Sequence, residues 1–320
     1  MINLKDIDLK IIGYLYNHNR EPFTKIAKSL KLTRQQVEYS ISKLEQEGII
    51  QGYFPVINYS KLSYNLFTII LLKFSNSSQI KSFKEKYKND SHRILHGELL
   101  SQYDLFMTLI FKDEKERNEY LLNLFQNNQI SSHLIIEPYY NEMYPLKFIG
   151  NNTQNSFVMI DYNKEEIKLD ERDKKILKIL SINARTKLID IASKSKTSIE
   201  SVLYKIKRME KERLILGSRA YFDMDKIGYF YTLLLINMTQ MSKSNQEKIK
   251  NFAKTNPNID SISLMANTPN CYIQVFNKSE SELREVLKSL KEHFKEELFS
   301  VNILPLKNEG ENLNPLPFLS

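Results

Sequence analysis

The chain has 320 residues, 42% of them apolar and 26% charged, which is typical of a globular protein with room for two or more domains. Basic residues (46) outnumber acidic residues (38), and the net charge of +8 favours a polyanionic partner. The single cysteine, Cys271, excludes an internal disulfide and any zinc site with two thiolates. Because the longest apolar runs are too short to cross a membrane, and because no phosphate-binding glycine loop or secretory signal is predicted, we expect a cytoplasmic protein.

The chain repeats itself at an offset of 165 residues, and this register holds for more than fifty residues. Matched pairs are Asp8 and Asp173, Ile11 and Ile176, Arg20 and Arg185, Val37 and Val202, Tyr39 and Tyr204, and Gly52 and Gly217. After one inserted residue the offset becomes 166, which aligns Lys112 with Lys278. The sequence therefore predicts two copies of one unit, at about 1–148 and 166–307.

The first sixty residues of each copy are predicted to be helical. In copy one, Thr33 has the chemistry of an N-cap and Gly48 ends the helix that follows it. The short connector before Thr33 allows only a tight turn between two helices, which is the spacing of a helix-turn-helix. Ser198 repeats the cap in copy two. We expect residues 49–54 to form a small hairpin or wing.

The second part of each copy alternates between strands and helices in the order β-α-β-β-α-β, which is that of a ferredoxin-like domain. In copy one the predicted strands are 65–74, 92–100, 103–111 and 132–140, and the predicted helices are 78–89 and 113–127. In copy two the predicted strands are near 230–238, 259–266, 271–277 and 298–304, and the predicted helices are near 243–254 and 279–295.

The predicted fold class is therefore α+β, with two copies of a winged helix-turn-helix domain followed by a ferredoxin-like sheet domain. The expected domains are helix-turn-helix domain 1 (1–60), sheet domain 1 (61–148), a polar linker (149–165), helix-turn-helix domain 2 (166–225), sheet domain 2 (226–307) and a tail (308–320). Because the tail contains Gly310, Pro315 and Pro317, we expect it to be loose.

Segments 6–53 and 169–217 resemble the Lrp/AsnC family of transcription regulators. The family's signature Leu-Asp-x-x-Asp-x-x-Ile-Leu is nearly complete at 169–177, Asn-Ala-Arg follows at 183–185, and copy one keeps Glu-x-x-Gly-Ile-Ile at 45–50. The resemblance implies double-stranded DNA as the partner, RAM-type sheet domains for dimerisation or effector sensing, and no catalytic residue, metal or cofactor. Since such proteins usually carry one unit per chain, the tandem copy predicts an intramolecular pseudo-dimer, with a homodimer through the sheet domains as the alternative.

The second helix of each helix-turn-helix is the predicted recognition helix, because a helix fits the major groove and polar side chains there read base edges. In copy one the apolar stripe Val37, Ile41 and Leu44 is expected to face the protein. The expected DNA-binding residues are Thr33, Arg34, Gln35, Gln36, Tyr39, Ser42 and Lys43 in copy one, and Ser198, Glu200, Ser201, Tyr204, Lys205, Lys207 and Arg208 in copy two. The alternative is a solvated helix face without a ligand.

Charge differs between the two helix-turn-helix segments. Residues 21–54 contain five basic and four acidic residues, whereas the matching 186–219 contain nine and four. We therefore predict a division of labour in which copy one discriminates sequence and copy two supplies phosphate affinity.

The turn between the middle strands is the position at which the family binds a small-molecule effector, usually an amino acid. The residues there are Ser101, Tyr103 and Asp104 in copy one, and Asn267 and Asn270 in copy two. Both turns lack the glycine of the family's Gly-x-Tyr-Asp pattern, which argues against amino-acid binding in the usual manner. The same residues could instead close a hairpin.

Two other functions stay open. Siroheme decarboxylases share this architecture, and His92, Arg93 and His96 lie in the relevant region of copy one, although copy two has no matching histidine. On a strand, His92 and His96 would be about 13 Å apart, which is too far for one metal ion. The third possibility is an assembly or sensing protein whose DNA-binding domains are vestigial.

Overall fold

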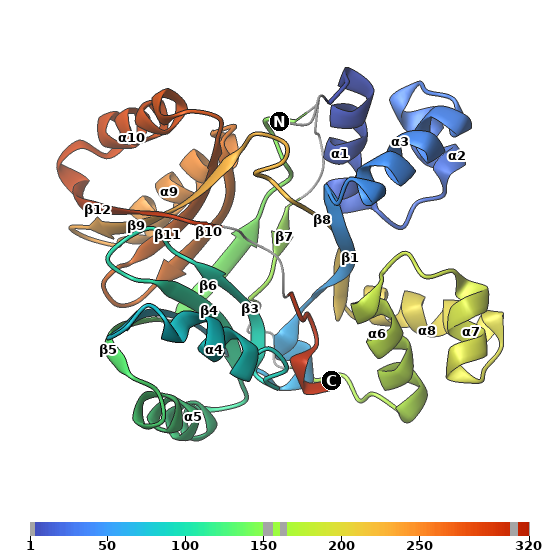
Figure 1. Ribbon diagram of the computed structural model, residues 1–320, viewed down its shortest axis with the longest axis horizontal. Helices are drawn as coiled ribbons and strands as arrows, with labels where there is room; N and C mark the ends of the chain where they lie inside the picture. Colours follow the sequence, from blue (N-terminus) through green and yellow to red (C-terminus); the bar gives the residue numbers. More distant parts are fainter. Residues whose placement is uncertain (1–3, 150–155, 161–164, 308–312, 320) are drawn as a thin grey trace.

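The computed structural model describes residues 4–149, 156–160, 165–307 and 313–319, and its elements follow the same order in both copies (Figure 1). The α-helices are α1 (Asp6–His18), α2 (Phe23–Leu30), α3 (Arg34–Gln46), α4 (Gln79–Lys86), α5 (Glu114–Gln126), α6 (Glu171–Ile182), α7 (Leu188–Ser195), α8 (Ile199–Lys211), α9 (Lys243–Thr255) and α10 (Glu280–Phe294). The strands are β1 (Ile50–Ile57), β2 (Leu66–Phe74), β3 (Arg93–Glu98), β4 (Leu105–Phe111), β5 (Ile130–Ile136), β6 (Pro138–Met143), β7 (Phe157–Val158), β8 (Ile215–Phe222), β9 (Phe230–Met238), β10 (Ile259–Met265), β11 (Cys271–Asn277) and β12 (Leu298–Pro305). Within the described ranges, no helix is long and apolar enough to cross a membrane.

Each copy begins with a three-helix helix-turn-helix, as predicted. In copy one, α2 and α3 are joined through Lys31, whose left-handed backbone (φ 56°) ends α2 and allows the tight turn. The equivalent Lys196 (φ 51°) does the same between α7 and α8. The predicted apolar stripe of α3 is confirmed, since Val37, Ile41 and Leu44 are all buried.

Each copy continues with an antiparallel sheet in the ferredoxin-like order. The first sheet is ordered β3-β4-β2-β5, and the second is β12-β9-β11-β10 extended by β6 and β7. The sequence-based strands and helices agree with the structure to within a few residues at each end. Strand β6 was missed as a separate element: it belongs to copy one, yet it pairs with β10 of copy two.

The segment expected to form a wing instead joins the two copies. Residues 50–57 form β1, which pairs antiparallel with β8, the matching strand of copy two. Phe54 lies opposite Arg219, its own equivalent at the offset of 165, so a local pseudo-twofold axis passes through this pair. The prediction of a local hairpin at residues 49–54 was wrong because an extended segment rich in β-branched and aromatic residues can satisfy its hydrogen bonds with any matching strand, local or distant.

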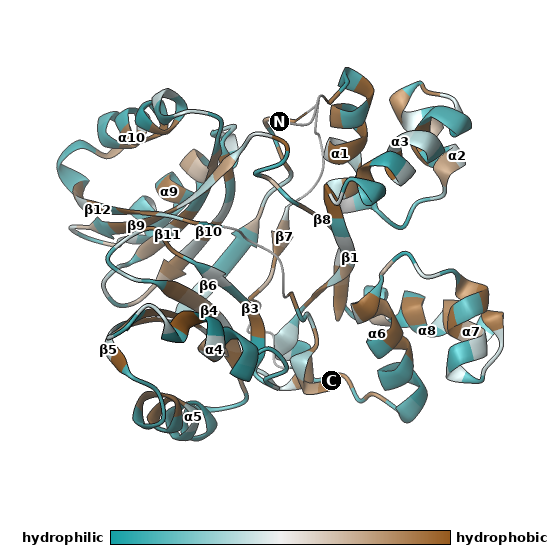
Figure 2. Cartoon of the chain, viewed as in Figure 1, coloured by the Kyte–Doolittle hydropathy of each residue, from teal (hydrophilic) through white to brown (hydrophobic). Residues whose placement is uncertain are grey.

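The inner strands β2, β4, β9, β10 and β11 are buried on both faces, which explains their continuous apolar runs. Along β2, Ile70 and Leu72 pack under α4 and α5, whereas Ile69 and Leu71 point into a central core shared with β1, β8 and the second sheet. The helices α9 and α10 cover the outer face of the second sheet in the same way (Figure 1). Figure 2 shows apolar stretches on the sheet strands and a largely polar α10 on the outside.

The linker and the tail differ from the prediction where the structure describes them. In the linker, residues 150–155 and 161–164 lie outside the described residues, but Phe157 and Val158 form β7 beside β6. In the tail, residues 308–312 and 320 also lie outside them, and residues 313–319 are packed rather than loose. The ring of Phe318 stacks on Tyr64 at 4.4 Å between centroids, and the Tyr59 hydroxyl donates a hydrogen bond to the carbonyl of Pro315 (2.9 Å). The prolines suggested a loose end, but the apolar residues between them anchor the segment.

The packed tail yields a first prediction. Leu316 is 1% exposed in the core around α6 to α8, so Leu316→Ala should lower the free energy of unfolding by about 2–4 kcal/mol through lost burial and a residual cavity. Phe299→Ala is the control, because Phe299 is 77% exposed and its loss should cost under about 0.5 kcal/mol. Urea denaturation of both variants measures the difference, and equal midpoints would show that the tail is loose after all.

Candidate nucleic-acid interface

The N-terminal end of α3 is capped and carries exposed polar side chains. The Thr33 hydroxyl accepts a hydrogen bond from the Gln36 amide (3.1 Å), and the Gln36 side chain accepts one from the Thr33 amide (2.8 Å), which forms a capping box. Thr33 and Gln36 therefore stabilise the start of the helix. The remaining outward side chains of the predicted set, which are exposed along one face, are Arg34, Gln35, Tyr39 and Ser42.

The opposite edge of α3 is fixed to α1 by a buried carboxylate. Asp8 accepts hydrogen bonds from the hydroxyl of Ser40 and from Nζ of Lys43 (3.1 Å). Burial raises the pKa of Asp8, but the hydrogen bonds from Ser40, the Lys5 amide and Lys43 outweigh it, so the pKa lies below its ordinary value. Lys43 was expected to face outward and instead turns back to this carboxylate.

In copy two, α8 has the same cap and a different outward face. The Ser198 hydroxyl accepts a hydrogen bond from the Ser201 amide (3.2 Å), as predicted for an N-cap. The outward positions of the helix are occupied by Ile199, Glu200, Leu203, Tyr204 and Lys207. This face carries fewer hydrogen-bonding groups near its start than α3 does.

Two of the expected DNA-binding cations of α8 are used inside the protein. Lys205, which is 9% exposed, donates to Asp170 (2.6 Å) and to Asp173 (3.0 Å), and Arg208 donates to the same Asp173 (2.7 Å). The hydrogen bond from Lys205, together with the Asp173 amide, lowers the pKa of Asp170 to about 2. Lys205 and Arg208 were therefore placed wrongly on the outward face: a long cationic side chain at the edge of a helical stripe can fold back onto a buried acid.

These ion pairs reduce the charge difference between the two copies. Six of the nine cations in 186–219 stay exposed: Lys187, Lys194, Lys196, Lys207, Lys211 and Arg213. In 21–54, Lys43 is the one cation of the five that turns inward. Copy two therefore still presents more positive charge, but by a smaller margin, and much of that charge comes from α7 and the end of α8.

The turns that were candidate effector sites close hairpins. Asp104 accepts hydrogen bonds from Nζ of Lys73 (2.7 Å) and from the Phe74 amide (2.8 Å). In copy two, Asn270 both accepts from and donates to the backbone of Met238. The hydroxyl of Ser101 bonds within its own turn, to the backbone of Tyr103. The local role of these residues is thus structural, and effector binding by them or by Asn267 stays a prediction.

His92, His96 and Cys271 belong to the sheet domains and not to the recognition helices. His92 packs on Phe111 and Tyr120 and approaches Asp90 and Glu116, while burial lowers the pKa of His96 to about 4 and keeps its ring neutral. Cys271 is buried, as expected for a small apolar residue at a strand start. Among the residues that the structure covers, no three His, Cys, Asp or Glu side chains gather closely enough to hold a metal ion.

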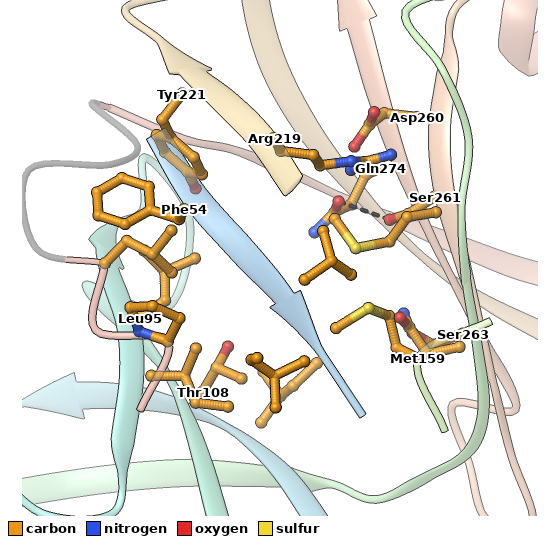
Figure 3. Close-up of a pocket in the computed structure, with 18 of the residues that line it drawn as sticks. Phe54, Leu95, Thr108, Met159, Arg219, Tyr221, Asp260, Ser261, Ser263 and Gln274 are labelled. Atoms are coloured by element: carbon orange, nitrogen blue, oxygen red, sulfur yellow. Dashed lines mark hydrogen bonds between the residues drawn. The ribbon is translucent and has the colours of Figure 1, made fainter. Parts of the chain in front are cut away.

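A cavity that the sequence did not reveal lies between the two copies. It has a volume of about 180 Å³ and is bordered by the β1–β8 ribbon and by both sheets (Figure 3). Arg219, Asp260 and Gln274 are among its polar residues, and Phe54 and Leu95 lie across from them. An acid inside a fully buried and otherwise uncharged strand, as in 259–265, is the signal that would have pointed to this site.

Comparison with known proteins identifies the repeated unit. The model of a winged helix-turn-helix DNA-binding family matches residues 4–51 and 169–215, once in each copy. An uncharacterized HTH-type transcriptional regulator of Pyrococcus abyssi is 26% identical over 137 residues, which are 42% of this chain and 92% of that protein. The HTH-type transcriptional regulator LrpA of Pyrococcus horikoshii is 44% identical over 62 residues, or 19% of this chain and 44% of that protein.

Solved structures of the siroheme decarboxylase NirDL match both copies together. The crystal structure of the siroheme decarboxylase NirDL covers 98% of this chain and 96% of its own, with a TM-score of 0.64 and 13% sequence identity. At this identity the likeness shows the shared fold, including the arrangement of two helix-turn-helix and two sheet domains, and nothing about the reaction.

The buried acid of α6 gives a second prediction. Asp173→Ala should lower the free energy of unfolding by about 3 kcal/mol, because it leaves Lys205 and Arg208 without their shared carboxylate and removes part of the capping box. Glu171→Ala on the same helix removes an exposed pair with Lys174 and should cost less than about 1 kcal/mol.

Denaturation curves of the two variants provide the measurement. Combining Asp173→Leu with Lys205→Met should recover part of the loss, because the buried ammonium of Lys205 is removed together with its partner, whereas the half-buried Arg208 still loses its carboxylate. Equal stability of the Ala variants would show that the carboxylate does not hold α8.

Proposed function

We propose that this chain, which belongs to the Lrp/AsnC family as a tandem duplication of the family's unit, is a sequence-specific transcription regulator that binds double-stranded DNA and is not an enzyme. The observation that carries the proposal is the placement of two capped, outward-facing recognition helices on one side of the molecule, at opposite ends of the β1–β8 ribbon (Figure 1). The relatives named as HTH-type transcriptional regulators support it. A cytoplasmic location, as expected from the sequence, would give such a regulator access to the chromosome.

A single chain supplies both halves of the DNA-binding unit in this proposal. Helix-turn-helix dimers contact two half-sites about one helical turn apart, and their twofold symmetry sets the symmetry of the operator. The antiparallel pairing of β1 with β8 provides the equivalent relationship within one chain. A homodimer is then not required to complete the interface.

The two halves are proposed to bind differently. On α3, Arg34 and Gln35 can form bidentate hydrogen bonds with guanine and adenine. On α8, the apolar Ile199 and the acidic Glu200 occupy the matching positions, and Lys207 lies about two turns further along. This contrast supports the division of labour in which copy one discriminates sequence and copy two adds phosphate contacts.

The likeness to siroheme decarboxylase raises the enzymatic alternative, which the described residues do not favour. The central cavity of about 180 Å³ is smaller than the roughly 300–1,000 Å³ of sites for drug-sized ligands, and a tetrapyrrole is larger still. No histidine is among the described residues that line it, and Arg93 is buried with its guanidinium bonded to the carbonyls of Tyr87 and Lys88. Anaerobic incubation with siroheme, monitored by absorbance, separates the two functions: a product spectrum would support the enzyme.

The selected DNA site should be non-palindromic. Selection of bound duplexes from a random library should return two unlike half-sites, because the outward faces of α3 and α8 differ at almost every position. Arg34→Ala should relax the preference at one base pair of one half-site and cost about 1–3 kcal/mol on the selected sequence, with little effect on random DNA. A palindromic consensus, or no retardation of any duplex by the intact chain at about 50 mM salt, would contradict the proposal.

The salt dependence of DNA binding should distinguish a cation that contacts phosphate from an exposed cation elsewhere on the surface. Lys207→Ala should weaken binding to all duplexes and reduce the slope of log K against log salt by about one. Lys10→Ala is the matched control, since Lys10 is an exposed lysine on α1 outside the recognition helices, and should leave the slope unchanged. Fluorescence anisotropy between about 50 and 200 mM salt provides the slopes. If both variants behaved alike, the α8 face would not be in contact with phosphate.

A further inference from the structure

Apart from Tyr16, the residues that line the central cavity lie outside the segments that match the DNA-binding family. Most of its lining comes from β1, β8 and the two sheets, whereas the family match ends at residues 51 and 215. Its volume of about 180 Å³ corresponds to about six water molecules, so a ligand with one aromatic ring and a short side chain fits it. Both copies contribute to its walls.

The two sides of the cavity have different chemistry (Figure 3). The sheet of copy two contributes Asp260, Ser261, Ser263 and Gln274, to which β6 adds Asn141. The sheet of copy one contributes mainly apolar side chains, which are Phe67, Ile69, Ile94, Leu95 and Phe106. Such a one-sided arrangement of polar groups orients a ligand that is polar at one end and apolar at the other.

On the polar side, several donors are already engaged within the protein. The amide of Asn141 donates to Ser263 (2.8 Å), and the amide of Gln274 donates to the hydroxyl of Tyr272 (2.7 Å). Arg219 donates to the carbonyl of Tyr144 (2.7 Å), and its guanidinium lies 4.3 Å from the centre of a tyrosine ring. The guanidinium is thereby held by structural contacts.

The strongest acceptor in the cavity is a buried carboxylate. Asp260 is 3% exposed, and its Oδ1 accepts a hydrogen bond from the Tyr16 hydroxyl (2.6 Å). Because a carboxylate can accept about four hydrogen bonds, the group retains capacity toward the cavity that it lines. Burial raises the pKa of Asp260, although the charge of Arg219 and the Tyr16 hydrogen bond act against it. A ligand with a positive charge and hydrogen-bond donors would compensate for this burial.

We propose that this cavity binds a small primary amine, whose ammonium group pairs with Asp260 and whose apolar body packs against Ile69, Leu95 and Phe106. The site goes beyond the proposed DNA-binding function and does not depend on it. Since β1 and β8 form one wall and also join the two helix-turn-helix domains, an amine bound here would contact the element that sets their spacing.

The test uses three probes of nearly equal size and different charge: 2-phenylethylamine, 2-phenylethanol and phenylacetate. Calorimetry on the purified full chain without DNA should give binding of the amine at least about tenfold tighter than that of the alcohol, because the charge-assisted hydrogen bond is lost with the alcohol. Phenylacetate should bind most weakly. Preferred binding of the alcohol or of phenylacetate, or no binding of the amine, would overturn the proposal.

Two variants locate the site. Asp260→Asn should remove the preference for the amine over the alcohol, whereas Glu280→Gln, which removes an exposed carboxylate on α10, should preserve it. Leu95→Phe keeps Asp260 and fills part of the cavity, so it should weaken binding of all the probes that bind the unchanged chain. Unchanged amine binding by either cavity variant would place the amine elsewhere and refute the assignment. Because no DNA is present, these results are independent of the tests of DNA binding.

Discussion

The pairing of β1 with β8 is the contact on which the rest of the arrangement depends. It joins the two copies through main-chain hydrogen bonds around a local twofold axis at Phe54 and Arg219. Each helix-turn-helix then packs across this ribbon onto the other copy: the Ala184 amide donates to the carbonyl of Tyr53 (2.7 Å), and the Ser218 hydroxyl donates to Asn19 (2.7 Å). Two further pairings join the copies: β6 of copy one pairs with β10 of copy two, and Leu99 of copy one forms a bridge with Leu306 of copy two. Neither copy therefore completes its own core alone.

Much of the fold could be predicted from the sequence because its signals are local. The 3.6-residue period of α3, the N-caps at Thr33 and Ser198 and the apolar runs of the strands each fix an element without reference to the rest of the chain. The pairing partners of the strands could not be predicted in this way. Residues 50–57 have the same pattern whether they turn back on themselves or pair with a strand 165 residues away, and the repeat alone does not distinguish the two. The same holds for β6 and for the tail around Leu316.

The candidate interface was only partly predictable for a similar reason. Asp8 and Asp173 stood out as matched positions, but their role as anchors depends on which side chains reach them. In copy one the partners are Ser40 and Lys43, and in copy two the matching residues are Lys205 and Arg208. A helical stripe places the backbone of such residues at its edge and leaves the direction of a long side chain undetermined. A cation on a recognition helix is therefore available to DNA only where no acid of the first helix of the same domain binds it.

Fusion of the two copies permits an asymmetry that a homodimer cannot have. In a symmetric dimer the residue on the axis faces itself, so an arginine there would oppose a second arginine, and like charges directly across a strand pair are destabilising. Here Arg219 lies opposite Phe54, and the guanidinium packs on the aromatic ring of Tyr16. The cavity beside it likewise has one polar and one apolar side, since Asp260 belongs to copy two and the matching strand of copy one, β3, presents Ile94 and Leu95. For the same reason the outward faces of α3 and α8 carry different side chains. Duplication within one chain has thus retained the twofold framework while each half specialised.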